Sequence, residues 1–213
     1  MSHVFSEKPI QNIRSVLTSV PPEYFSRVFN GNNVFPCICS AIDWLSVAIE
    51  NIDFYPSFPL VGADHESAIQ HALLLMRVSW IKEAIDQLNR IMNKTTKTYL
   101  VDDRSVFANA TLDDNDYFQE LRAMFAAHQT NLSPVLYNNK SNEKGFFASW
   151  PFGTYDGLAV FIYSKKQNAP IDKIVFPYKK IEEFAFMRYS YLTEVEQIIE
   201  KIANDYYNKT NNS

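Results

Sequence analysis

The longest regular pattern in the chain is residues 64–93, which read DHESAIQHALLLMRVSWIKEAIDQLNRIMN. Apolar side chains recur there every three to four residues over about seven turns, and no β-strand combines that length with that period. The pattern predicts one long helix from about Asp64 to Asn93. Its apolar stripe consists of Ile69, Leu73, Met76, Trp80, Ala84, Leu88 and Ile91.

Shorter segments with the same period surround this helix. Pro9 suits a first helical position, and the apolar stripe that follows it stops at Pro21. Pro22 can start a short helix, and a further stripe runs from Ile38 to Ile52. These segments predict three more helices on the N-terminal side of residue 64.

The C-terminal end of the chain has its own helical pattern. Apolar residues share one face from Leu192 to Tyr206, and Thr193 with Glu196 has the spacing of a capping box, in which each side chain bonds the other residue's backbone N–H. We expect a closing helix there, with a frayed tail from Asn208.

Three short aromatic and β-branched runs precede the closing helix, at residues 146–150, 158–163 and 174–178. Gly, Asp and Pro separate them, which is typical of two or three antiparallel strands that must pack on helices to be stable. The sequence therefore predicts a mainly α fold: a bundle of four or more helices with a small antiparallel β-sheet or hairpin inserted before the C-terminal helix. We expect a single domain over 1–213, with a helical core at about 8–131, a β-unit at about 145–178 and a C-terminal helix at about 190–207.

Composition limits the possible functions. The net charge is −4, with 20 basic and 24 acidic residues, so a general nucleic-acid coat is excluded and any RNA contact must be local. Cys37 and Cys39 cannot complete a zinc site alone, which favours two reduced thiols in the core. No run approaches the roughly 20 apolar residues of a membrane span, and no secretory signal opens the chain. We expect a cytoplasmic protein without membrane contact.

Several polar clusters have residue types found at metal or catalytic sites. His65 and His71 are six residues apart, whereas a zinc-binding helix prefers a spacing of four, so a solvent-facing helix start is the better interpretation. The aspartates of 102–104 and 113–116 lack the ladder of a calcium loop and suit caps and loops. Ser149-Trp150-Pro151 and Asp156 could line a pocket, but no base or oxyanion donor can be assigned there. The sequence predicts no metal and no cofactor.

The segment 111–131 carries the one pattern that fits a known chemistry. It predicts a helix with an acidic N-terminus, and Arg122 precedes His128 by six residues near its end. On a continuous α-helix the two side chains would lie about 120° apart around the axis and roughly 9 Å apart along it. One helix therefore cannot bring both to one phosphate. Two copies across a two-fold axis could, with histidine moving a proton and arginine stabilising phosphate charge.

Arg-x5-His at the end of a helix, within a helical bundle, resembles the HEPN (higher eukaryotes and prokaryotes nucleotide-binding) superfamily. Its motif is Arg-x4–6-His, which maps to Arg122 and His128. The resemblance implies a metal-independent RNase of a toxin or phage-defence system, acting as a homodimer on RNA, with an antitoxin as a further partner. Ala123 departs from the polar residue common after the arginine. The alternative from the residues themselves is a non-catalytic helical module that binds a protein partner through its many aromatic side chains, drawn from 16 Phe and 12 Tyr.

Overall fold

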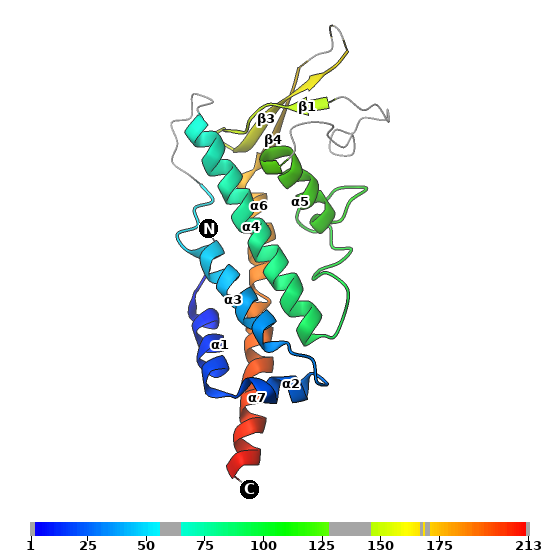
Figure 1. Cartoon of the computed structure of the whole chain (residues 1–213). Helices are drawn as coiled ribbons and strands as arrows, with labels where there is room; N and C mark the ends of the chain where they lie inside the picture. The colour runs from blue at the N-terminus through cyan, green and yellow to red at the C-terminus, as the bar shows by residue number, and fades with distance from the viewer. Residues whose placement is uncertain (1–2, 56–64, 128–145, 167, 169–170, 212–213) are drawn as a thin grey trace. The chain divides into compact units, whose positions relative to one another are not determined.

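The fold is mainly helical, with a small antiparallel sheet ahead of the C-terminal helix, as the sequence predicts (Figure 1). The computed structural model describes residues 3–55, 65–127, 146–166, 168 and 171–211. These residues divide into two compact units, which are described one at a time.

The first unit comprises Met1–Asn51, Trp80–Tyr99 and Ala185–Ser213. Its core forms where the apolar stripes of the terminal helices meet, because α1 packs on both α3 and α7. The helices of this unit are α1 (Lys8–Ser19), α2 (Pro22–Val28), α3 (Phe35–Ile49), the second half of α4 (His65–Met92), the end of α6 (Tyr178–Tyr189) and α7 (Leu192–Asn211).

The predicted capping box of the closing helix is wrong. Thr193 lies inside α7, which begins at Leu192. The turn that joins α6 to α7 satisfies the first backbone donors, with the N–H groups of Thr193 and Glu194 bonding the carbonyls of Ser190 and Tyr191. Because the Glu196 carboxylate is then not needed as a cap, it accepts a hydrogen bond from Asn12 on α1.

The two cysteines are reduced, but the prediction that they lie in the core is wrong. Cys37 is exposed and Cys39 is half-buried on α3. Each lies one residue from Ile38, which is fully buried. A helix turns by about 100° per residue, so both neighbours of a core residue point away from the core.

The second unit comprises Ile52–Ser79 and Leu100–Phe184. It contains the first half of α4, the start of α6, and two consecutive helical segments, α5 (Asp114–Arg122) and the π-helix η1 (Ala123–Ala127). Asp113 is the N-cap of α5 and accepts from the Asp116 N–H at 2.8 Å. The buried Asp114 carboxylate accepts from the N–H groups of Val106 and Phe107. Asp113 thus serves as a cap, as predicted, whereas Asp114 is buried and is not the solvated loop residue that the sequence predicts.

Among the described residues, the sheet of the second unit has four strands instead of the two or three predicted. They are β1 (Phe146–Ala148), β2 (Phe152–Gly153), β3 (Gly157–Ser164) and β4 (Asp172–Pro177). β3 is central: β1 and β2 pair with one edge of it and β4 with the other, all antiparallel. The break between β1 and β2 is held by Ser149, whose hydroxyl accepts from the Phe161 N–H.

One face of this sheet is buried, and we call it the inner face. Leu158, Val160 and Ile162 of β3 are buried there, at 2% exposure or less. The Phe125 ring of η1 contacts the ring of Phe176 on β4, with centroids 5.3 Å apart and planes at 82°. α5 and η1 therefore cover the inner face.

The predicted stripe of α4 is buried only in its second half, at Ala84 and Leu88, and is wrong in the first half. Ile69, Leu73 and Met76 are exposed, and Ile69 retains 66% of its surface. Leu74, Leu75, Val78, Ile81 and Ile85 are buried in their place. The run Leu73-Leu74-Leu75 supports two apolar stripes with the same period, so periodicity alone could not identify the core face.

Candidate functional site

Arg122 ends α5 and is half-buried within the second unit. Its Nη1 donates to the Ser79 hydroxyl of α4 at 3.1 Å. Its Nε is buried and has no hydrogen-bond acceptor among the described residues. No described carboxylate forms an ion pair with it. A guanidinium carries five donors and a permanent charge, so this arginine is positioned by one bond and retains the capacity to bind an anion.

The helix changes character directly after Arg122. η1 follows α5 without a break, and Met124 and Phe125 are both buried. A π-helix bonds residue i to i+5 and so widens the turn. The sequence-based separation of about 120° and roughly 9 Å between Arg122 and His128 assumed a continuous α-helix, and that assumption is wrong. π-helical turns are rare and occur frequently at functional sites.

His128 lies outside the described residues. The structure therefore gives no distance between His128 and Arg122, and the Arg122/His128 pair stays a prediction.

The interpretation of His71 as part of a solvent-facing helix start is wrong, because His71 is fully buried. Its Nε2 lies 2.7 Å from the Tyr178 hydroxyl of α6, and its Nδ1 lies 3.3 Å from the Ser67 hydroxyl. Gly153 of β2 lies against the same pair: a Cβ at Gly153 would approach the His71 ring to 3.1 Å. The cluster joins α4, α6 and β2 inside the second unit, which is a structural role. The signal that could have identified it is that Ser67 and His71 share a helix face with Leu74 and Leu75.

The other residues that the sequence offers as site candidates do not form a common site in the described part of the chain. His65 is exposed, and its ring meets Trp150 edge-on at 5.7 Å between centroids. Ser149 holds the β1–β2 break. Asp156 is exposed, and its carbonyl accepts from the Tyr178 N–H. In the described part of the chain, no three His, Cys, Asp or Glu side chains are placed to hold a metal ion. None of the described helices combines the length and apolarity that a membrane crossing needs.

Tyr178 gives the cluster a pH dependence. Burial, with a further contribution from the charge of Asp53, raises the pKa of Tyr178 to about 12 from the ordinary value of 10.0. A raised pKa means that the folded state favours the protonated phenol. Its contribution to stability is therefore complete below pH 10 and is lost as the pH rises from about 10 through about 12.

We expect Tyr178→Phe to flatten the fall in the free energy of unfolding above pH 10. At pH 7 the variant loses the bond to His71, at a cost of about 1 kcal/mol. Urea unfolding at pH values from 7 to 11.5 measures both effects. Tyr155→Phe, at an 85% exposed tyrosine, is the matched control and should follow the wild type. Identical alkaline slopes in Tyr178→Phe and wild type would contradict the assignment.

No protein-family model, no curated protein and no solved structure matches this chain. The function must therefore be inferred from the site itself.

Proposed function

We propose that this protein is a metal-independent RNase of HEPN type, in which Arg122 binds the scissile phosphate and His128 transfers the proton. The observation that carries the proposal is the Arg122 guanidinium, which has a buried Nε with no acceptor and no carboxylate partner among the described residues. A phosphate oxygen supplies both the acceptor and the negative charge.

The chemical roles follow from the two side chains. A guanidinium fixed through Ser79 stabilises the charge that develops on the phosphate as the ribose 2′-oxygen attacks it. Histidine changes charge near neutral pH and can therefore accept the 2′-hydroxyl proton and give it to the 5′-oxygen as the P–O5′ bond breaks, which leaves a 2′,3′-cyclic phosphate and a 5′-hydroxyl. The proposal includes a two-fold homodimer with one shared cleft and a cytoplasmic location, where an antitoxin would restrain it.

The first test is RNA cleavage in the presence of EDTA. Arg122→Ala and His128→Ala should each lower the cleavage rate by a factor of about 100 to 1,000, as removal of a phosphate-stabilising or proton-transferring group does. Arg122→Lys keeps the charge but loses the planar fork, so it should recover only part of the rate. Arg27→Ala and His65→Ala, at exposed residues, are the matched controls. Unchanged cleavage in both Arg122→Ala and His128→Ala would remove the catalytic assignment.

The second test is assembly. The proposed active site needs a second protomer, so sedimentation should show a dimer at micromolar concentration. The α5–η1 segment should lie in the dimer contact. A monomer, or a dimer whose contact lies away from this segment, leaves Arg122 and His128 without a shared site.

A second candidate function is a binding module without catalysis. Ala123 supports it, since active HEPN members commonly have a polar residue there. Two exposed aromatic side chains of β3, Phe161 and Tyr163, support it as well.

A further inference from the structure

The sheet has an outer face opposite the one covered by α5 and η1. Paired residues of neighbouring strands point to the same side of a sheet, and successive residues alternate. The register pairs Phe147 with Tyr163, Phe152 with Ala159, Ala159 with Val175, and Phe161 with Lys173. The outer face therefore comprises Phe147, Phe152, Ala159, Phe161, Tyr163, Lys173 and Val175.

This outer face is aromatic and open. Phe161 is 38% exposed and Tyr163 is 41% exposed, although their neighbours in sequence, Val160 and Ile162, are buried on the inner face. Phe152 and Phe161 stack with ring centroids 5.0 Å apart and planes 29° apart. Phe161 keeps its 38% exposure despite this stacking, so part of its ring is available for a further flat group to stack on.

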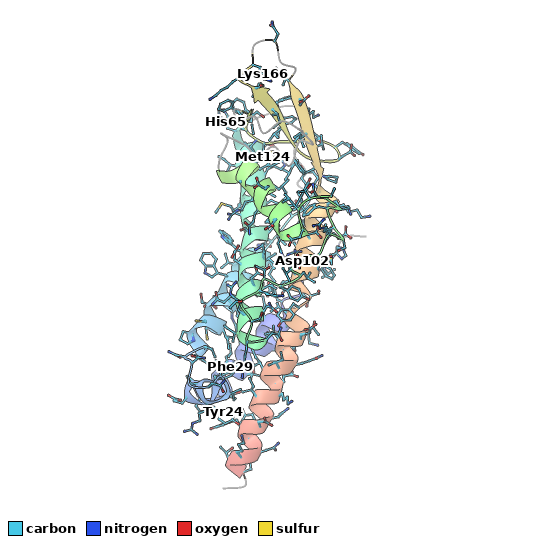
Figure 2. All side chains as sticks on the ribbon, turned by 90° about the vertical axis from the view of Figure 1, so that its right-hand side faces the viewer. Tyr24, Phe29, His65, Asp102, Met124 and Lys166 are labelled. Carbon is cyan, nitrogen blue, oxygen red and sulfur yellow. The ribbon has the colours of Figure 1, made fainter. Side chains whose placement is uncertain are left out.

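The charge on the outer face is positive, although the whole chain carries −4. The Lys173 ammonium lies 5.5 Å from the centre of the Phe152 ring, and the Lys165 ammonium lies 5.5 Å from that of Phe147. Lys166 lies in the turn after β3 (Figure 2). Asp172 pairs with Ile162 and so belongs to the inner side. Within the described strands, no carboxylate lies on the outer face.

We propose that the outer face binds single-stranded RNA, with bases stacked on Phe161 and Tyr163 and phosphates at Lys165 and Lys173. Unpaired bases stack on aromatic side chains while a positive surface follows the backbone. An apolar protein partner would bury two ammonium groups without supplying a counter-charge, which is costly. A duplex hides its base faces within its own stack. The preference for RNA over DNA rests on the proposed function, whereas the stacking and the charge do not depend on cleavage.

The test is fluorescence anisotropy with a labelled uridine 12-mer, in a chain carrying His128→Ala so that cleavage cannot deplete the probe. Phe161→Thr and Tyr163→Thr keep strand propensity but remove the ring, and each should raise the Kd about 5- to 100-fold. Lys173→Gln should weaken binding and reduce the slope of log K against log salt by about 0.7.

The chain offers matched controls on α7. Tyr207 has the same 41% exposure as Tyr163, and Lys209 lies 5.6 Å from the Tyr24 ring centre, as Lys173 does from Phe152 at 5.5 Å. Tyr207→Ala and Lys209→Gln should leave the Kd unchanged. Circular dichroism and thermal melting confirm that each variant is folded before binding is scored.

Several results would overturn the inference. These are absence of binding, equal Kd values for the outer-face variants and the α7 controls, competition by duplex RNA as strong as by the single strand, or tighter binding of a thymidine 12-mer than of the uridine 12-mer. The outcome is separate from that of the cleavage assay, because the outer-face variants are compared for Kd in a chain in which His128→Ala already removes cleavage. Cleavage without outer-face binding would remove this inference alone.

Discussion

Asp86→Ala should destabilise the protein by about 3–5 kcal/mol, because it leaves a buried ammonium without its charge partner. Lys82 and Asp86 are one turn apart on α4, with Nζ and Oδ2 2.9 Å apart and side chains that are 3% and 2% exposed. The other oxygen of Asp86 accepts from the Tyr99 N–H at 2.7 Å. In the described part of the chain, the other acid paired with Lys82 is Glu83, at 3.5 Å and largely exposed, which compensates poorly.

The measurement is the free energy of unfolding in urea. Asp43→Ala is the control, because the Arg14–Asp43 ion pair is short but exposed, and its loss should cost less than about 1 kcal/mol. The double variant Lys82→Met/Asp86→Leu removes both charges and should be more stable than Asp86→Ala alone. Equal losses in Asp86→Ala and Asp43→Ala would show that the Lys82–Asp86 pair is not desolvated as the structure indicates.

Local patterns account for the part of the fold that the sequence predicts. The sequence predicts the 64–93 helix and the strands near 146–178 because periods of about 3.6 and 2 are properties of neighbouring residues. The choice of buried face on α4 is a property of its partners. Both wrong predictions on α4, that of the exposed Ile69 stripe and that of the solvent-facing His71, have this cause.

In the candidate site too, the sequence predicts local features but not those that depend on tertiary contacts. The acidic cap of α5 follows from the sequence, but the end of α5 at Arg122 does not, because the pattern predicts one helix that continues to His128. The π-helix does not follow from the sequence either, because its wider turn accompanies the burial of Met124 and Phe125, and Phe125 makes a tertiary contact with Phe176 of the sheet. Because side chains alternate between the two faces along β3, the sequence places Phe161 and Tyr163 on one face and Leu158 and Val160 on the other. Only the register with β4, however, places Lys173 beside Phe161.

Gly157→Ala should destabilise the second unit by about 3 kcal/mol or more, because the added methyl group has no room. Gly157 is buried at the start of β3, and a Cβ there would lie 1.9 Å from the Phe176 carbonyl oxygen and 2.9 Å from the Pro177 Cα, both in β4. The glycine cannot move away easily, since its N–H donates to the Thr154 hydroxyl and its carbonyl accepts from the Thr154 N–H.

The methyl group must therefore force β3 and β4 apart where Gly157 pairs with Pro177, and this shifts the strands that carry Phe161 and Lys173. Gly31→Ala is the matched control: Gly31 has φ +82° but nothing within 4 Å of its added Cβ, so only backbone strain of about 1 kcal/mol is expected. Urea unfolding compares the two variants, and hydrogen exchange at the β3 amides locates the loss. If Gly157→Ala cost no more than Gly31→Ala, the close approach of β3 to β4 would be wrong. If it lost stability but kept full RNA affinity, the outer face would not need the β3–β4 register to bind.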